Sequence, residues 1–574
     1  MDPSILEKAE SWLNSDIDSQ SKEEIRSLLA SKSNDLADAF YKDLEFGTGG
    51  LRGIMGIGSN RINKYTVGKA TQGLANYLKQ TVVNETIKVA VAYDSRNNSR
   101  YFAEITASVF SANGIEVYFF DELRPTPQLS FAVRHFGCQS GVVITASHNP
   151  KEYNGYKAYW NDGAQLVPPH DRGVISQVNN IKSIDAIQFD RDDSMIHTVG
   201  KELDKIYLDK IAKQSIAPEV IAKHNDLKIV FSSIHGTGIT LVPEILSNLG
   251  FTQVNIVEEQ AEPNGDFPTV VYPNPEEAEA MTLALAKAQE ADADLVMATD
   301  PDADRIGIAV KNHKGQFQLL NGNQTGALLV NYILTRYQQK NLLVPEQYIV
   351  KTIVTSEMIK AIADGFGVDC YDTLTGFKYI AALIKSLEGR RKFIAGMEES
   401  YGYMIGDFVR DKDAVATCAM LAEMAADFKD KSVSIFDGLI ELYQRVGYYK
   451  EALVSVTKKG QQGAQEIQKM MQDLRETPPA TLAGSPMAKV IDYQSGHSND
   501  ITTNTTEQLD LPKSNVLQFI SEDGSKVSAR PSGTEPKIKF YIGVREPLES
   551  KADFNRISEV LDTKIDRIKS DVGF

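Results

Sequence analysis

Short apolar runs alternate with stretches of helical spacing, and this alternation repeats three times along the chain. The first repeat predicts strands at 88–94, 115–120 and 141–144, separated by a helix through Phe102, Ile105 and Val109 and a helix over about 127–136. The second predicts strands at 228–233, 254–257 and 294–298, with helices around 240–249 and 276–290. The third predicts strands at 348–354, 368–371 and 392–395, with helices around 356–364 and 376–387. Strands that alternate with helices favour parallel sheets covered on both faces, so we expect three tandem α/β domains.

The pattern changes after about residue 445. A helix is predicted over 461–476, followed by a Thr-, Ser-, Pro- and Asn-rich segment at 477–512, and then strands at 516–520 and 537–544 before a last helix. This predicts a fourth, α+β domain. We expect domain I at 1–205, domain II at 206–322, domain III at 323–445 and domain IV at 446–574, each within the usual size range of domains.

The last strand of each repeat runs directly into a polar loop. These loops read TASHNP (145–150), TDPDADR (299–305) and MEESYG (397–402). Ligands of open α/β sheets collect at the carboxyl ends of the strands. Three such ends would form one composite site if they meet at a single cleft.

Composition narrows the possible partners. The 574 residues are 42% hydrophobic and 24% charged, with a net charge of −16 from 61 basic and 77 acidic residues. An acidic chain argues against a broad nucleic-acid or anionic-membrane surface, so a local basic cluster must hold any anionic substrate. Three widely spaced cysteines indicate reduced thiols, and no signal peptide or apolar stretch of transmembrane length is found. We expect a soluble, cytoplasmic protein, whose oligomeric state the sequence does not give.

Asp300, Asp302 and Asp304 alternate along the chain. In an extended backbone they would project on one side, where three oxygens suit a hard cation such as Mg²⁺. An acidic turn is the alternative interpretation. An EF-hand is disfavoured, because Arg305 stands at the position where that loop requires glycine.

Ser147 and His148 stand at the tip of the predicted strand 141–144, with Lys157 just beyond. A catalytic serine and a helix cap are both compatible with this position. The flanking residues exclude the G-x-S-x-G elbow of hydrolases. Lys157 is either functional or a solvated surface lysine.

Three further loops carry candidate chemistry. Arg530-Pro-Ser-Gly-Thr534 offers a guanidinium, two hydroxyls and accessible N–H groups, which suit a phosphate cradle or a simple turn between strands. Glu398, Glu399 and Ser400 are either acceptors for sugar hydroxyls or a helix cap. The glycine-rich loop at 46–53 contains Arg52 but lacks a nucleotide-binding fingerprint. Together, the loops point to phosphoryl transfer on a sugar phosphate.

The chain resembles the α-D-phosphohexomutase superfamily, most closely its phosphoglucomutase branch with phosphopentomutase-like members. The matching motifs are FGTGGLRG (46–53), TASHNPKEYNGYK (145–157), TDPDADR (299–305), TLTGFK (373–378), EESYG (398–402), RDKD (410–413) and RPSGTEPK (530–537). They occur in the family's order and span about residues 40 to 545. The resemblance implies four domains in a heart-shaped arrangement around a central cleft.

The resemblance also implies a role for each matching residue. Ser147 would carry the phosphoryl group, with His148, Lys157 and Arg52 as catalytic neighbours; Ser147, Asp300, Asp302 and Asp304 would bind Mg²⁺. Substrate contacts are implied for Thr48, Arg305, Thr375, Gly376, Glu398, Ser400 and Lys412. The idle phosphate would be held by Arg530, Ser532, Gly533 and Thr534. We expect burial near cations to lower the pKa of Lys157 so that it serves as a general base.

The implied reaction interconverts α-D-glucose 1-phosphate and glucose 6-phosphate through a phosphoserine and glucose 1,6-bisphosphate, which is both intermediate and activator. Phosphomannomutase and phosphopentomutase activities stay open, although the EES loop favours glucose. A metal-dependent sugar phosphatase and a non-catalytic sugar-phosphate binding protein are alternatives of a different class. Three features depart from the family pattern: Met397, a longer loop between Gly402 and Arg410, and the 477–512 segment.

Overall fold

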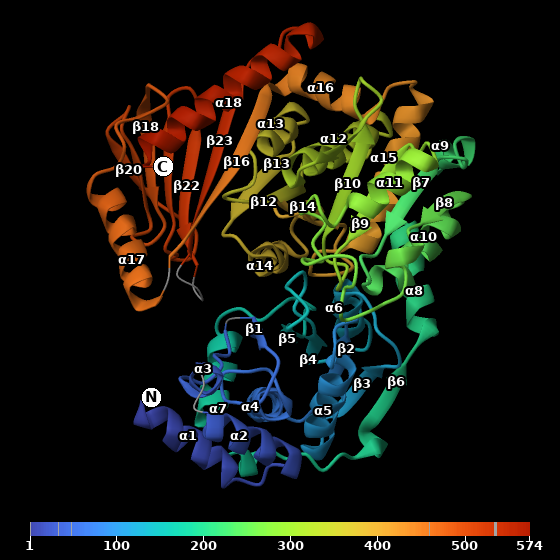
Figure 1. The fold of residues 1–574 in the computed structure, drawn as a ribbon. Helices are drawn as coiled ribbons and strands as arrows, with labels where there is room; N and C mark the ends of the chain where they lie inside the picture. The colour runs from blue at the N-terminus through green and yellow to red at the C-terminus, as the bar shows by residue number, and fades with distance from the viewer. Residues whose placement is uncertain (1, 32–33, 48, 459, 533–536, 574) are drawn as a thin grey trace. The chain divides into compact units, whose positions relative to one another are not determined.

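The computed structural model describes residues 2–31, 34–47, 49–458, 460–532 and 537–573. These residues form two compact units (Figure 1). Unit 1 comprises Met1–Thr325 and Phe377–Ser432, and unit 2 comprises Gly326–Gly376 and Val433–Phe574. Among the described residues, no helix has the length and apolar character needed to cross a membrane.

Unit 1 begins with three helices, α1 (Pro3–Leu13), α2 (Ser19–Ser31) and α3 (Asn34–Phe40). Their apolar faces share a small core in which Phe40 and Tyr65 are buried. Trp12 contacts both rings edge-on. This helical cluster therefore packs on the first α/β domain through α4 (Lys64–Thr81), the helix that carries Tyr65.

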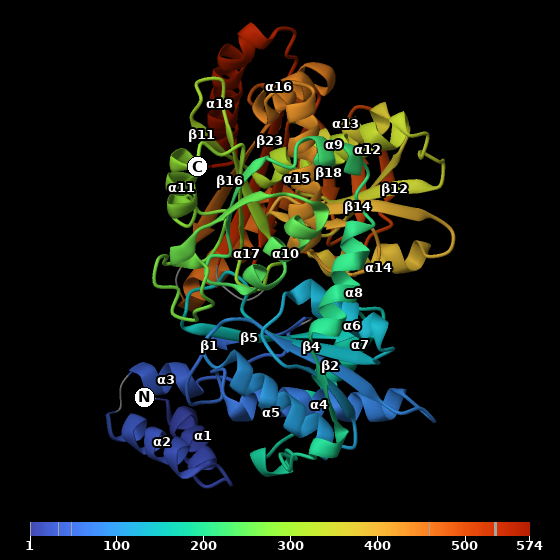
Figure 2. The same ribbon diagram turned by 90° about the vertical axis from the view of Figure 1, so that its right-hand side faces the viewer.

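The first sheet has the strand order β1-β5-β4-β2-β3-β6. Its strands are β1 (Gly50–Ile54), β2 (Lys88–Tyr93), β3 (Glu116–Phe120), β4 (Ser140–Ile144), β5 (Tyr153–Trp160) and β6 (Ile196–Val199). The strands β2, β3, β4 and β6 are parallel, whereas β1 and β5 run antiparallel to their neighbours. Helices α4 and α5 (Ser99–Ala112) cover one face and α6 (Thr126–His135) the other, while α7 (His170–Asn180) packs on α4 (Figure 2). Burial on both faces explains why β4 is continuously apolar apart from Ser140.

The second sheet has the order β11-β10-β9-β7-β8. Its strands are β7 (Lys228–Ser232), β8 (Gln253–Ile256), β9 (Leu295–Thr299), β10 (Ile306–Lys311) and β11 (Phe317–Leu320), with helices α8 (Lys201–Ala212), α9 (Pro218–Lys223), α10 (Val242–Leu249) and α11 (Thr282–Glu290). The helix predicted from 276 begins only at Thr282. Asn274 and the two prolines beside it form turns instead, which Glu277 N–H closes by donating to the Asn274 carbonyl.

The elements of the third repeat occur in both units. Unit 2 contains the parallel pair β12 (Gln347–Thr352) and β13 (Asp369–Thr373), with α13 (Met358–Gly365) between them. Unit 1 contains α14 (Phe377–Leu387), the antiparallel pair β14 (Lys392–Glu398) and β15 (Gly402–Ile405), and α15 (Ala414–Asp430). The helix α12 (Gly322–Gln339) begins in unit 1 and continues in unit 2.

The rest of unit 2 is an antiparallel sheet with α18 (Phe554–Asp571) along it (Figure 1). The strand order is β16-β23-β22-β21-β18-β19-β20, and β17 pairs with β18. The strands are β16 (Tyr448–Thr457), β17 (Thr481–Leu482), β18 (Ser485–Asp492), β19 (His497–Asp500), β20 (Thr505–Gln508), β21 (Leu517–Ser521), β22 (Lys526–Pro531) and β23 (Lys537–Glu546). The remaining helices are α16 (Ile435–Val446) and α17 (Gly460–Glu476).

The predicted fold class, three α/β repeats followed by an α+β region, is confirmed. What the sequence pattern missed are the antiparallel strands β5, β10 and β15, which turn back directly after the three polar loops. The 477–512 segment also forms the strands β17–β20, although its Thr- and Ser-rich composition gave no strong alternation.

A buried ion pair ties α8 to the loop before α6. Arg124 donates to Asp204 through Nε at 3.0 Å and Nη2 at 2.9 Å, and Gln128 donates to the same carboxylate. The two charged side chains are 3% and 10% exposed. Removing the carboxylate would leave a buried guanidinium without its main partner.

We expect Asp204→Ala to destabilise unit 1 by about 3–5 kcal/mol, the usual cost of breaking a buried ion pair on one side. The measurement is the midpoint of thermal unfolding, which should fall by several degrees. Asp209→Ala is the matched control, because Asp209 is exposed on the same helix. Equal midpoints for the two variants would contradict the assigned role of this pair.

Candidate functional site

Ser147 lies in a tight loop between β4 and β5. Its N–H donates to Thr145 Oγ1 at 2.8 Å, and its φ of 53° is in the left-handed region. Ser147 Oγ lies 3.1 Å from His148 Nδ1 and donates to Asp300 Oδ2 at 2.9 Å. The helix-cap interpretation of Ser147 is wrong, because a strand follows the loop. The hydroxyl instead points to the aspartate loop of the second domain.

The three aspartates lie in a turn that joins β9 to β10. Asp300 Oδ1 accepts hydrogen bonds from the N–H groups of Asp304 and Arg305 at 3.1 and 3.0 Å. Ala303 has a φ of 50°. The expectation that an extended backbone aligns the carboxylates is therefore wrong, because a turn around Asp300 brings them together.

The carboxylates of Asp300, Asp302 and Asp304 form a buried cluster. One oxygen of each lies within 4.8 Å of the others. Burial and the two neighbouring carboxylates raise the pKa of Asp300 well above its usual value. Asp302 Oδ1 and Asp304 Oδ1 are buried, and neither accepts a hydrogen bond from the described residues. Oxygen donors with unused lone pairs are what a hard divalent cation requires, so this cluster can hold a metal ion.

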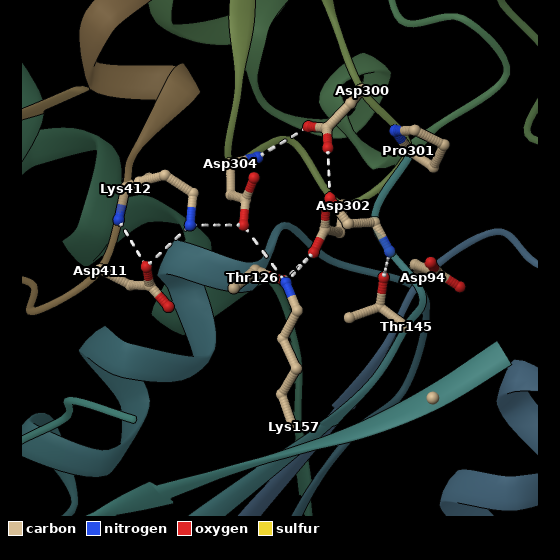
Figure 3. Close-up of polar contacts among 12 residues, drawn as sticks. Asp94, Thr126, Thr145, Lys157, Asp300, Pro301, Asp302, Asp304, Asp411 and Lys412 are labelled. Atoms are coloured by element: carbon tan, nitrogen blue, oxygen red, sulfur yellow. Dashed lines mark hydrogen bonds and ion pairs between the residues drawn. The ribbon is translucent and has the colours of Figure 1, made fainter. Parts of the chain in front are cut away.

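Two buried lysines neutralise part of this charge (Figure 3). Lys157 Nζ, from β5, lies 2.7 Å from Asp302 Oδ2 and 3.2 Å from Asp304 Oδ2. Lys412 Nζ lies 3.0 Å from Asp304 Oδ2 and 3.3 Å from Asp411 Oδ1. The side chains of Lys157 and Lys412 are 11% and 9% exposed, respectively. The interpretation of Lys157 as a solvated surface lysine is therefore wrong.

The charge state of Lys157 differs from the sequence-based expectation. Burial disfavours its ammonium form, but the adjacent Asp302 and Asp304 outweigh this effect and raise its pKa above the usual value. Lys157 is therefore protonated in this arrangement, and the expected lowering of its pKa is wrong. The physical reason is that its nearest charges are carboxylates rather than cations.

The hairpin between β14 and β15 carries Glu398, Glu399 and Ser400, so the helix-cap interpretation of these residues is wrong. Gly402 follows them, and a Cβ on it would lie 2.1 Å from Lys412 Cδ. Only glycine leaves room for the Lys412 side chain to pass. Arg305 pairs with Gly402 through an isolated β-bridge, which joins the aspartate loop to this hairpin.

Arg305 and His148 complete the surroundings of the aspartates. Arg305 Nε lies 3.9 Å from Asp304 Oδ1, and its Nη1 lies 3.7 Å from Glu276. Burial, together with the nearby charges of Arg305 and Arg52, holds the pKa of His148 well below its usual value. The imidazole is therefore neutral, and one of its nitrogens can accept a hydrogen bond.

Sequence reasoning missed the residues that support the charged groups. Thr126, at the start of α6, donates through Oγ1 to Asp302 Oδ2 at 2.9 Å and through N–H to the Asp302 carbonyl at 2.8 Å. Tyr159 and Gln165 donate to Asp411 Oδ2 at 2.7 and 2.9 Å. Asp411 falls within the RDKD motif, but nothing in the sequence around Thr126 distinguishes it from an ordinary helix start.

The glycine-rich segment leads into β1, which pairs with β5. Arg52 Nη1 donates to Asn149 Oδ1 at 3.2 Å, which brings the exposed guanidinium next to the serine loop. Gly50 has a φ of 132°, and a Cβ on it would overlap the Tyr156 carbonyl at 1.7 Å. Thr48 lies outside the described residues.

The other predicted substrate residues belong to unit 2. Thr375 and Gly376 follow β13, and Gly376 has a φ of 118°. Arg530 lies on β22 opposite Lys539, and Ser532 N–H donates to the Lys537 carbonyl at 2.7 Å. The predicted cradle thus starts at the end of a β-hairpin, and Gly533 and Thr534 lie outside the described residues.

We expect Asp302→Asn to weaken Mn²⁺ binding by on the order of 10-fold or more, because one anionic ligand becomes neutral. Loss of the free-Mn²⁺ signal in electron paramagnetic resonance titrations measures the affinity. Asp226→Asn is the control, since its carboxylate is exposed on the same domain. Equal Mn²⁺ affinity in both variants would rule out the aspartate cluster as the metal site.

Comparison with known proteins identifies the family. The phosphoglucomutase/phosphomannomutase models for alpha/beta/alpha domains I, II and III match residues 43–185, 205–315 and 321–443. Proteins named phosphoglucomutase from Staphylococcus epidermidis and Staphylococcus aureus are 38% and 39% identical over 520 and 532 residues. These matches cover 89% and 92% of this chain and 92% and 93% of the relatives.

Solved structures agree on the fold. The open form of parafusin, a phosphoglucomutase from Paramecium, superposes with a TM-score of 0.70 at 18% identity and covers 93% of this chain and 96% of its own. A putative phosphomannomutase from Thermus thermophilus gives 0.66 at 20% identity and covers 91% of this chain and 99% of its own. The family models and the relatives at 38% and 39% identity show that the chain belongs to the phosphoglucomutase/phosphomannomutase family.

Proposed function

We propose that this protein is a phosphoglucomutase that interconverts α-D-glucose 1-phosphate and glucose 6-phosphate. The observation that carries the proposal is the contact of Ser147 Oγ with Asp300 at 2.9 Å, beside a buried carboxylate cluster with unused oxygens. The names of the relatives, at 38–39% identity over most of their length, support glucose phosphates as substrates. Glucose 1,6-bisphosphate is the intermediate and the activator.

The reaction moves one phosphoryl group at a time. The phosphorus–oxygen bond of phospho-Ser147 breaks as a new bond forms to O6 of glucose 1-phosphate, which gives the 1,6-bisphosphate. After the sugar reverses its orientation, the 1-phosphoryl group returns to Ser147 and glucose 6-phosphate leaves. Such transfers depend mainly on positioning and charge stabilisation, which a site built from buried ionic groups supplies.

Lys157 is the proposed general acid. Because it is protonated beside Asp302 and Asp304, it can first donate a proton to the departing Ser147 oxygen. The proton lost by the attacking sugar hydroxyl then restores the ammonium, so protons balance across the step. Arg52 and the neutral His148 flank the serine and would orient the phosphoryl oxygens.

Asp300, Asp302, Asp304 and the Ser147 oxygen are the proposed Mg²⁺ ligands. Their oxygen-only chemistry matches the preference of this ion, and two buried carboxylate oxygens are available for it. When bound, Mg²⁺ would draw negative charge from the phosphoryl oxygens and so favour transfer.

The remaining residues are proposed to bind the substrate. The proposed substrate contacts are Thr48, Arg305 and Lys412, and the proposed contacts of the sugar hydroxyls are Thr375, Gly376, Glu398 and Ser400. The phosphate that does not react would be held by Arg530, Ser532, Gly533 and Thr534. The guanidinium and hydroxyl groups of this second set supply the charged and neutral donors that a phosphate needs.

We further propose four domains, at 1–205, 206–322, 323–445 and 446–574, and a cytoplasmic location. Three cysteines without disulfides, Cys138, Cys370 and Cys418, support this compartment. The net charge of −16 supports small sugar phosphates, rather than nucleic acid or a membrane, as partners.

We expect Ser147→Ala to lower kcat by a factor of at least ~10³, because the phosphoryl carrier is removed. Intact-mass measurement after incubation with glucose 1,6-bisphosphate should show one added phosphoryl group on the wild type and none on the variant. Ser108→Ala, a change at a partly exposed position of α5, is the control and should behave as wild type in both assays.

Two other outcomes would identify a different protein class. A phosphatase would release inorganic phosphate steadily, whereas a mutase releases little and is stimulated by the bisphosphate. A non-catalytic binding protein would show no turnover that Ser147→Ala could remove. Either result would reject the mutase proposal.

Substrate preference is a separate prediction. We expect kcat/KM to be highest for glucose 1-phosphate, followed by mannose and ribose 1-phosphates, because a hydroxyl that points the other way, as at C2 of mannose, or that is absent, as in ribose, leaves buried polar groups unpaired. Initial rates with the three sugars at matched concentrations measure the order. A preference for mannose or ribose would make the protein a phosphomannomutase or phosphopentomutase that uses the same serine and metal chemistry.

A further inference from the structure

Ser147 has a backbone conformation that an L-residue rarely adopts, with φ at 53°, and the loop around it must be held in place. The carbonyl groups of Ser147, Asn149, Pro150 and Tyr153 all accept hydrogen bonds from one side chain, that of Arg96. Arg96 Nη2 donates to the carbonyls of Ser147, at 2.6 Å, and Asn149. Arg96 Nη1 donates to Pro150 and Tyr153 at 2.9 and 3.1 Å.

Arg96 is itself fixed on its other sides. Its Nε lies 3.4 Å from Asp94 Oδ2, and neither side chain is exposed to solvent. Asp94 Oδ1 in turn accepts hydrogen bonds from Arg96 N–H and from Ser99 Oγ, at 2.9 and 2.6 Å. The guanidinium therefore sits in a prepared position directly after β2.

A segment of the second domain covers the guanidinium. The ring centroid of Phe267 lies 5.0 Å from Arg96 Cζ, and this ring is buried. A Cβ on Gly265 would lie 2.2 Å from Asn97 N, so only glycine permits this close packing. The same guanidinium thus contacts the serine loop of the first domain and an aromatic ring of the domain that carries the aspartates.

We propose that Arg96 is a positioning residue, which holds Ser147 in the left-handed conformation that directs its hydroxyl at the aspartate cluster. The inference rests on Ser147 being the phosphoryl carrier. The hydrogen bonds of Arg96 go to backbone carbonyls, so it acts through the loop rather than on the reacting atoms. Its planar fork is essential, because two nitrogens reach four carbonyls that a lysine ammonium could not span.

The experiment compares Arg96→Ala, Arg96→Lys and the control Arg100→Ala, which removes an exposed arginine on α5. For Arg96→Ala we expect kcat to fall about 100-fold, as expected for a displaced reactive group, while KM changes by less than about threefold. Phosphorylation of Ser147 by glucose 1,6-bisphosphate should slow by a similar factor. Guanidinium ion at non-denaturing concentrations should restore part of both rates.

Arg96→Lys keeps the positive charge and provides a second test of the proposal if the alanine variant does not fold. We expect it to unfold near the wild-type temperature but to lose about 10-fold in kcat, with no response to guanidinium. The proposal is overturned if Arg96→Lys matches the wild type, or if a folded Arg96→Ala loses only thermal stability. Ser147→Ala separates the two proposals: if that variant stays active, the carrier role fails, whereas an inactive Ser147→Ala with a fully active Arg96→Ala rejects the positioning role alone.

Discussion

The mutual repulsion of three buried carboxylates is the constraint on which the centre of unit 1 depends. Asp300, Asp302 and Asp304 would be strongly unfavourable so close together without compensating cations. Lys157, Lys412 and Arg305 supply positive charges beside them, although Lys412 also contacts Asp411 and Arg305 also lies near Glu276. These cations come from different segments of the chain, so the carboxylates hold those segments together.

This charge cluster bears on the proposed chemistry. A phosphoryl group on Ser147 would add roughly −2 charge at neutral pH, next to these carboxylates. A divalent cation held by the same aspartates would add +2 and offset that charge. Phosphorylation of Ser147 and metal binding would therefore favour each other electrostatically, because the two charges are opposite in sign and close together. The raised pKa of Asp300 has the same origin, because protonation of Asp300 removes one of the crowded negative charges.

Sequence patterns predicted the elements and loops well because apolar periodicity and motif spacing are local properties. The strands β2, β4, β7 and β9 were found within one or two residues. The geometry of the charges was not predictable in the same way. An alternating Asp triad suggested an extended strand, but the backbone N–H groups of Asp304 and Arg305 wrap around Asp300. The pKa of Lys157 likewise depends on which charge lies nearest in space. No local sequence pattern marks Arg96 or Thr126, because the residues that they contact are distant in sequence.

The antiparallel strands that the sequence pattern missed explain how each repeat contributes to one charge network. In a βα unit the chain leaves the sheet after the loop, whereas here β5, β10 and β15 return beside the preceding strand. The returning chain brings a cation back toward the carboxylate or hydroxyl side chains of its own loop or of a neighbouring one. Lys157 lies on β5 after Ser147, Arg305 precedes β10 after the three aspartates, and Lys412 follows β15 after Glu398. Gly402 shows that the third return is shaped for its lysine, because any Cβ there would occupy the path of Lys412. A hairpin that contains the polar loop thus places opposite charges a short distance apart, whereas a helix running away from the sheet would separate them.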